Sequence, residues 1–352
     1  MRYLKRVFLR VSKVVGLFHL ARRVTARGLR IICYHGIALA DEARFRPQLF
    51  VSPATFGRRL RCLSAGGFPV LPLDGALDAL DKGNLPACPT VITIDDGFYS
   101  VYTHGLQPLR RFSFPATLYV TTYYALKETP VFRLAVQYMF WKTGRAEADL
   151  SALNIASLGR LSLTDARQRE QDMWRIIHYG ETQCSEVERG ALARTLGACL
   201  AVDYQHIVDL RSLTLVNATE LREMAANGID VQLHTHRHSF PDNEVAATQE
   251  ILENKAALEP LVGKALTHFC YPSGKWSRDQ WSWLATAGIR SATTCEPGLN
   301  YAETPRFALS RFLDGEHISQ IEFEAEIFGY AELLRRSRAW FKRVSFREGI
   351  RR

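Results

Sequence analysis

The chain has 352 residues, 47% of them hydrophobic, which is enough for one large α/β core with additions. It contains no run of about 18 apolar residues, the length needed to span a membrane. Its net charge is +9, but no nucleic-acid recognition motif accompanies the basic residues, so a nucleic-acid-binding protein is not expected. Seven cysteines without a Cys-x-x-Cys pair favour reduced thiols over a disulfide framework.

The charge is distributed unevenly along the chain. Residues 1–30 contain nine Lys or Arg and no acidic residue, and residues 331–352 have a net charge of +6. These two ends leave a net charge of −6 for residues 31–330. An acidic body with two basic ends suggests that the ends contact an anionic partner.

Both ends have an amphipathic helical pattern. The apolar residues that recur at helical spacing near the N-terminus are Leu4, Val7, Phe8, Val11, Val14, Val15 and Phe18. We predict a basic amphipathic helix over 1–28 and a basic amphipathic segment over 321–352, both in contact with an anionic membrane surface. Packing of both segments on the protein body, with solvated basic faces, is the alternative.

A secretory signal peptide is not expected at the N-terminus. Lys13 and His19 interrupt the apolar segment, and Arg22 and Arg23 follow where a cleavage site of small residues belongs. We therefore predict a cytoplasmic protein that is peripheral on the inner face of the membrane.

Strand-like runs alternate with helical patterns through most of the chain, which predicts an α/β fold with a parallel barrel. The runs lie near 29–35, 68–71, 90–95, 115–121, 229–234, 267–271, 289–294 and 307–312. Ser52 and Pro53 predict the start of a helix that ends at Gly66, and a second helix is predicted over 219–227.

Two sets of polar residues follow buried strands. Asp95 and Asp96 come directly after one strand, with Gly97 allowing a bend, and His234 and His238 follow another. Because the carboxyl ends of parallel strands carry the active sites of such folds, we expect these side chains to meet. One carboxylate and two imidazoles can hold a divalent ion and leave a position open for water, while the second aspartate acts as a base.

Three motifs in this order resemble those of the polysaccharide deacetylases of the NodB-homology type, carbohydrate esterase family 4. Residues 93–97 are similar to the family's Thr-Phe-Asp-Asp-Gly, residues 234–238 to its His-Thr-x-x-His, and residues 269–274 to the Phe-x-Tyr-Pro-x-Gly of one subgroup. The resemblance extends over residues 29–121 and 214–312. It implies a distorted parallel (β/α) barrel formed by 29–121 and 214–320.

The same resemblance assigns roles to individual residues. Asp95 would be the catalytic base, and Asp96, His234 and His238 would bind the metal, with zinc expected and cobalt, nickel or ferrous iron as alternatives. Binding of the substrate and of the oxyanion would fall to five further residues, namely Tyr271, Pro272, Ser273, Gly274 and Arg311.

The sequence departs from the family pattern at two positions. Cys270 stands where the commonest pattern has an arginine beside the catalytic aspartate, and Arg311 stands where a late histidine supplies the general acid. His35, at the end of the first strand, could replace that acid, although it could equally bind only backbone groups. His236 and His317 are weaker candidates for the same role.

Residues 122–213 interrupt the family pattern with a mostly helical insertion, which its place in the chain puts above the active-site edge. The insertion opens with aromatic residues, namely Tyr123, Tyr124, Phe132, Tyr138, Phe140 and Trp141. These could line a groove for a glycan or lipid, or they could form the insertion's own core.

Taken together, these features predict a metal-dependent hydrolase that removes an N-acetyl group from an amino sugar. The predicted location favours a lipid-linked glycan or glycolipid precursor as the substrate, within polysaccharide biosynthesis. Three alternatives stay open: another C–N hydrolase, such as a deformylase, on the same fold; a non-haem iron oxygenase, which uses the same ligand types; and a membrane-associated assembly component that binds glycan without turnover.

Overall fold

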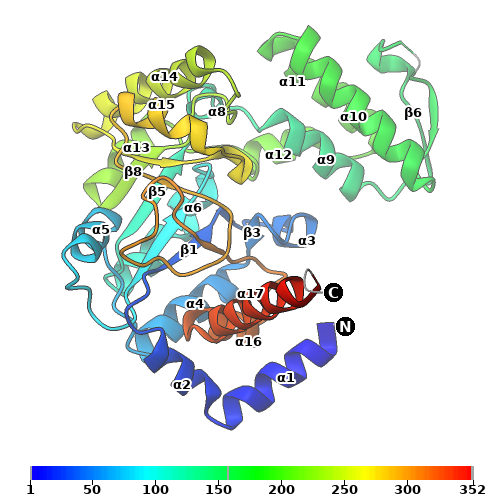
Figure 1. Cartoon of the computed structure of the whole chain (residues 1–352). Helices are drawn as coiled ribbons and strands as arrows, with labels where there is room; N and C mark the ends of the chain where they lie inside the picture. The colour runs from blue at the N-terminus through cyan, green and yellow to red at the C-terminus, as the bar shows by residue number, and fades with distance from the viewer. Residues whose placement is uncertain (1, 157, 350–352) are drawn as a thin grey trace.

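The structure, a computed structural model, describes residues 2–156 and 158–349, and the side chains of 3–156 and 158–340. A seven-stranded parallel sheet forms its centre, in the order β10-β9-β8-β5-β4-β1-β11 (Figure 1). Its strands are β1 (Arg30–Tyr34), β4 (Thr90–Ile94), β5 (Ala116–Val120), β8 (Ile229–Leu233), β9 (His268–Cys270), β10 (Ser291–Thr293) and β11 (Phe312–Leu313).

The sheet curls toward closure because one segment touches both of its edges. Leu309 forms a single parallel bridge with Thr293 of β10, and three residues later Phe312 pairs with Ile32 of β1. Every residue of β1, β4 and β5 is buried, as expected for strands that are covered on both faces. The predicted distorted parallel barrel is confirmed.

Two of the predicted strands differ from the structure. The run at 68–71 contributes only a single bridge between Val70 and Thr90, because Pro69 and Pro72 have no N–H for a ladder. The run at 307–312 reduces to the bridge at Leu309, and the paired strand β11 begins only at Phe312.

Helices surround the sheet. Ser52 caps α4 by accepting a hydrogen bond from Thr55 N, and Gly66 ends the helix, as predicted. The helix predicted at 219–227 is α13, which begins one residue earlier. The helices of the barrel are α4 (Pro53–Ala65), α5 (Leu73–Asp81), α6 (Tyr99–His104), α7 (Leu106–Arg111), α13 (Ala218–Ala226), α14 (Glu244–Val262) and α15 (Trp281–Thr286), with short helices η2 (Pro272–Gly274) and η3 (Arg278–Gln280). A small parallel pair, β2 (Gly36–Ile37) and β3 (Phe50–Val51), lies beyond β1 together with α3 (Glu42–Phe45).

Residues 122–213 form a mostly helical region beside the barrel, which Figure 1 draws in green. It consists of α8 (Thr122–Ala125), α9 (Phe132–Lys142), η1 (Ser151–Leu153), α10 (Ala166–Gln183), α11 (Glu186–Leu200) and α12 (Tyr204–Leu210), with an antiparallel pair, β6 (Glu147–Asp149) and β7 (Arg160–Ser162). Phe132, Tyr138 and Phe140 are buried here and belong to the same hydrophobic core as the barrel. For these three aromatics, the core interpretation is the one that the structure supports.

The two ends of the chain pack together as helices. They are α1 (Arg2–Val14), α2 (Leu17–Val24), α16 (Gln320–Ile327) and α17 (Tyr330–Gly349). The single helix predicted over 1–28 is wrong, because Gly16 has a left-handed backbone with φ of 82° that separates α1 from α2. Leu9, Phe18 and Tyr330 form a small separate core here. None of the helices in the described part of the chain has the length and apolar character needed to cross a bilayer.

Candidate active site

Asp95 and Asp96 follow β4 at the carboxyl edge of the sheet. Asp96 and Gly97 both adopt left-handed backbone conformations, with φ of 70° and 86°. Neighbouring residues in an extended strand would point to opposite faces, so this turn is what allows both carboxylates to line one cavity. A left-handed backbone at a non-glycine residue costs free energy, and such strain is concentrated at functional sites.

His234 and His238 follow β8 and join Asp96. The Oδ1 atom of Asp96 lies 3.3 Å from Nε2 of His234 and 3.4 Å from Nε2 of His238. The carbonyl oxygen of Cys270 lies 2.8 Å from Nδ1 of His234, which directs the other ring nitrogen toward Asp96. Oδ1 of Asp96 is buried and has no hydrogen-bond partner among the described residues.

This cluster fits a divalent metal ion. Asp96, His234 and His238 each offer one ligand atom, and the three atoms lie within 4.8 Å of one another. A carboxylate and two imidazoles are ligands that zinc and similar ions prefer, and an ion would supply the partner that buried Oδ1 lacks. These three residues are the ones for which the motifs implied a metal.

Asp95 is held by Arg311. Its two carboxylate oxygens accept hydrogen bonds of 2.7 and 2.8 Å from Nη1 and Nη2 of Arg311, in the bidentate geometry that makes such pairs strong. Arg311 is completely buried and also donates to the Thr294 carbonyl and to Thr93 Oγ1. Arg311 was expected among the substrate-binding residues; the structure instead places it behind Asp95, where it does not line the cavity.

Cys270 leaves room for this arginine. Its thiol lies 3.2 Å from Nη2 of Arg311 and 3.4 Å from Oδ2 of Asp95. The position at which the family commonly has an arginine therefore holds a small residue, and the arginine beside Asp95 comes from a different segment. Burial raises the pKa of Asp95, but the charge and hydrogen bonds of Arg311 outweigh it and hold this pKa below its usual range.

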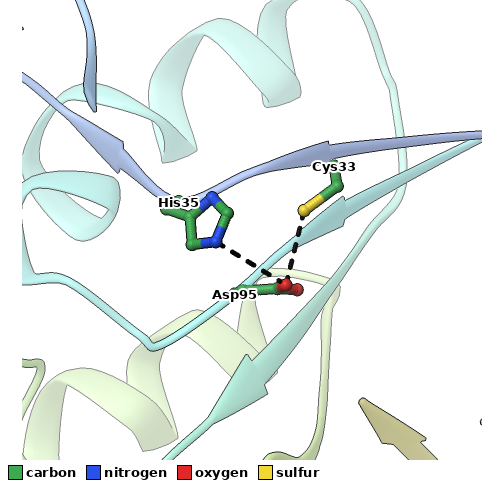
Figure 2. Close-up of side chains that lie close together, drawn as sticks. All are labelled: Cys33, His35 and Asp95. Atoms are coloured by element: carbon green, nitrogen blue, oxygen red, sulfur yellow. Dashed lines mark hydrogen bonds and ion pairs between the residues drawn. The ribbon is translucent and has the colours of Figure 1, made fainter. Parts of the chain in front are cut away.

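His35 follows β1 and lies beside Asp95. The register pairs Tyr34 of β1 with Ile94 of β4, so the next residue on each strand, His35 and Asp95, stand together at the sheet edge. Nε2 of His35 is 3.9 Å from Oδ2 of Asp95, and Figure 2 shows Cys33 of β1 and His35, just after β1, both directed at that carboxylate. Nδ1 of His35 is buried without a hydrogen-bond partner among the described residues, so the backbone-binding alternative finds no support at this atom.

A cavity of about 680 Å³ contains these groups. The barrel contributes His35, both aspartates, His234 and His238, and the insertion contributes a wall that includes Tyr123, Tyr124, Arg133 and Arg189. The size is that of a pocket for a small ligand. The first two aromatics of the insertion therefore line the cavity, whereas those that follow in α9 pack in the core or, like Trp141, lie partly exposed.

Of the loop after β9, Tyr271 and Ser273 line the cavity, while Pro272 and Gly274 do not. A side chain at position 274 would meet Cβ of Cys295 at 2.5 Å, so this turn requires glycine. Neither of the weaker histidine candidates lines the cavity. Nδ1 of His236 lies 2.8 Å from Thr122 Oγ1, and Nδ1 of His317 lies 3.0 Å from the Pro47 carbonyl.

Asn254 of α14 is a supporting residue that the sequence motifs do not reveal. Its Oδ1 accepts a hydrogen bond from the backbone N–H of His234, and its Nδ2 donates to the Val120 carbonyl. It is completely buried. In the sequence, Asn254 is only a polar residue on the face of a helix that packs against the sheet. A search for motifs does not select such a residue.

Comparison with known proteins agrees with this geometry. The family model for polysaccharide deacetylase matches residues 201–292, which include both histidines but not the aspartates. No curated protein sequence matches the chain.

Several solved structures share the fold. A deacetylase from Streptococcus pyogenes, PplD, in complex with acetate is 17% identical with a TM-score of 0.55, over 86% of this chain and 99% of its own. IcaB from Ammonifex degensii is 17% identical with a TM-score of 0.53, over 86% and 97%. A de-N-acetylase from Aggregatibacter actinomycetemcomitans is 13% identical with a TM-score of 0.52, over 85% and 99%.

At these identities the structural matches establish the fold alone. Asp95 and Asp96 lie outside the matched residues. The parallel sheet nevertheless brings them next to His234 and His238, because β4 and β8 end at the same edge. Over residues 201–292 the chain therefore resembles a polysaccharide deacetylase domain, and its barrel has the fold of the solved deacetylases.

Proposed function

We propose that this protein is a metal-dependent hydrolase that removes an N-acetyl group from an amino sugar. The observation that carries the proposal is a single cavity in which the Asp96, His234 and His238 cluster lies beside Asp95, whose carboxylate Arg311 holds. An open ligand set next to a fixed carboxylate is what attack of water on an amide requires.

A divalent ion held by Asp96, His234 and His238 would lower the pKa of a bound water to about 7 and polarise the amide carbonyl. Asp95 then accepts the proton of the attacking water, for which its lowered pKa keeps it ionised. Ser273 lines the cavity, and a backbone N–H of its loop would donate to the developing oxyanion.

His35 is our candidate for the proton donor to the leaving nitrogen. It lines the cavity, and its Nε2 is 3.9 Å from Asp95, close enough for both groups to reach one reacting amide. The carbon–nitrogen bond breaks, the oxygen of water leaves with acetate, and the nitrogen takes its proton from His35 as the free amine. His35→Gln should then lower the rate without loss of bound metal.

We further propose that the acetamido sugar is presented on a lipid carrier, during assembly of a polysaccharide or glycolipid. Tyr123 and Tyr124, which line the cavity, give a sugar ring an aromatic surface. The alternative of a binding protein without turnover rested partly on the absence of an arginine beside Asp95, and Arg311 removes that reason.

The test is acetate release from a lipid-linked N-acetylhexosamine and, separately, from soluble chito-oligomers. Wild type and Asp95→Asn are loaded with zinc, and bound metal is quantified in both. We expect release by wild type and a fall of about 10²- to 10⁴-fold in Asp95→Asn with metal retained.

The two substrates separate the parts of the proposal. Release from chito-oligomers but not from the lipid-linked sugar would refute the lipid carrier and keep the deacetylase. Metal bound by wild type without release from either substrate would refute the deacetylase and favour the binding-only alternative.

A further inference from the structure

Helix α1 exposes its apolar face and directs its basic face toward the protein. The exposed apolar residues of α1 and of the turn after it are Tyr3, Leu4, Val7, Phe8, Val11, Val14 and Val15, with exposed fractions from 37% to 86%. At 100° per residue they occupy one side of the helix, whereas Leu9 and Ser12 on the other side are buried. A helix packed on a soluble body has the reverse arrangement.

Ion pairs fix this orientation. Nζ of Lys5 lies 2.9 Å from Glu322 and Nε of Arg6 lies 3.5 Å from the same carboxylate, while Lys13 pairs with Glu324 at 2.5 Å. Both acidic partners lie on α16. The basic residues that the sequence suggested would face lipid are therefore largely used to attach α1 to the body, and its apolar side is left open.

Helix α2 adds to the same kind of surface. Leu17, Leu20 and Val24 are exposed by 38%, 57% and 62%. Figure 1 shows α1 and α2 at the outer margin of the molecule, with α16 and α17 between them and the sheet. We call the exposed apolar residues of α1, α2 and the turn between them the terminal apolar surface.

Basic residues accompany this surface. Arg10, Arg23 and Arg27 are exposed, and the structure gives none of them an ion pair with a described residue. Residues 1–30 contain no acidic residue at all. The positive charge around the terminal apolar surface is therefore uncompensated within its own segment.

We propose that the terminal apolar surface is the site at which the protein binds an anionic lipid bilayer, with α1 lying in the interface. The combination of exposed aliphatic and aromatic side chains with unpaired arginines matches both components of an anionic interface, its acyl boundary and its charged headgroups. A second copy of this chain is a poorer occupant, because a symmetric contact would bring the arginines of both copies together. The inference rests on the membrane setting of the proposed function, but its test does not depend on catalysis.

The test is flotation of the full chain with vesicles of phosphatidylcholine alone and of a two-to-one mixture of phosphatidylcholine and phosphatidylglycerol. We expect binding to the mixture and at least about fivefold weaker binding to phosphatidylcholine alone. The variant Leu4→Gln/Val11→Gln/Val14→Gln should lower the partition coefficient at least about tenfold. Arg10→Gln/Arg23→Gln should lower it only on the anionic vesicles.

A matched control changes exposed apolar residues elsewhere. Val187, Val245 and Leu252 are exposed by 83%, 79% and 48% on α11 and α14, and their replacement by Gln should leave vesicle binding unchanged. A spin label at position 11 should become shielded from an aqueous quencher when vesicles are added, and one at position 187 should not.

The inference would be overturned if wild type did not float with vesicles, or if the triple Gln variant floated equally well. It would also be overturned if wild type formed a dimer that the triple Gln variant did not form and neither protein bound vesicles. Acetate release from soluble chito-oligomers and from the lipid-linked sugar dispersed in detergent, measured on the same samples, should be unchanged by these surface variants. Failure of the deacetylase proposal would therefore appear in that assay and failure of the membrane inference in flotation.

Discussion

Two buried arginine–aspartate pairs lie near β11 and invite comparison. Arg311 holds Asp95 at the sheet edge, and Arg59 of α4 holds Asp314, whose Oδ2 is 2.8 Å from Nε of the arginine. All four side chains are at most 4% exposed. The two pairs thus share the same chemistry and the same burial, yet only one of them belongs to the cavity.

Their surroundings differ. Arg59 also donates to the Ile318 carbonyl and to Gln320 Oε1, and Asp314 accepts from the N–H of Gly315, so this pair is saturated by its own neighbourhood. Burial raises the pKa of Asp314 despite Arg59, whereas the pKa of Asp95 is lowered. Of these two carboxylates, Asp95 has the lowered pKa and is the one that lines the cavity with His35 and Asp96.

The comparison teaches that the groups around the carboxylate, rather than the ion pair itself, distinguish the two sites. Asp95 has His35 and the Asp96 cluster within reach in the cavity, whereas Asp314 faces the buried Tyr34 and the backbone N–H of Gly315 and lines no cavity with reactive groups. We therefore expect that breaking the Arg59 pair affects stability and that breaking the Arg311 pair affects chemistry.

The largest effect should come from Arg59→Met. This change leaves the Asp314 carboxylate buried without its cation, so the free energy of unfolding should fall by about 3–5 kcal/mol. Acetate release per folded molecule should stay within about twofold of wild type, because neither residue lines the cavity. Urea denaturation measures the loss, with exposed Arg61→Met as the control. A loss below about 1 kcal/mol would show that the pair is not the structural element we describe.

Arg311→Lys should have the next largest effect, but on the reaction. Lysine cannot form the bidentate contact with Asp95, so acetate release should fall about 10²-fold while bound metal is retained. Arg311 lowers the pKa of Asp95, and the base must be ionised; without the guanidinium, the acid limb of the pH profile should therefore move to higher pH. An unchanged profile at wild-type rate would contradict the role of Arg311.

A relocated arginine should recover part of this loss. Because Cys270 occupies the position at which the family commonly has an arginine, Cys270→Arg/Arg311→Leu should release acetate at least about tenfold faster than Arg311→Leu alone. Cys270→Arg by itself should be destabilising, since its guanidinium would lie against that of Arg311. A double variant no faster than Arg311→Leu, with the fold intact by circular dichroism, would show that the arginine must approach Asp95 from the β11 side.

The sequence predicted the parallel sheet and the position of Asp95, Asp96, His234 and His238 at its edge, because strand ends and motif spacing are local properties. It also placed His35 there, since β1 and β4 each end one residue earlier. The motifs treated Cys270 and Arg311 as two separate departures. Their contact joins segments 41 residues apart, and no local pattern contains that information.

Helix α1 shows a second limit of sequence reasoning. An amphipathic pattern reveals that a helix has an apolar and a basic face, but not which of them meets the protein. Here Glu322 and Glu324 decide, and they lie more than 300 residues further along the chain. The pattern also does not predict the break between α1 and α2 at Gly16, because apolar residues continue at helical spacing across it.

The smallest effect should come from Cys270→Ser, which tests whether size or sulfur matters at this position. The serine hydroxyl can donate to Oδ2 of Asp95 as the thiol does, and it is smaller than the thiol, so Arg311 keeps its place and acetate release should fall less than about threefold. Cys270→Leu adds volume where Arg311 Nη2 approaches within 3.2 Å, and it should behave like loss of the arginine. Similar rates for the Ser and Leu variants would mean that position 270 does not control the arginine. A steep difference would mean that a small residue there is the condition for Arg311 to hold the base.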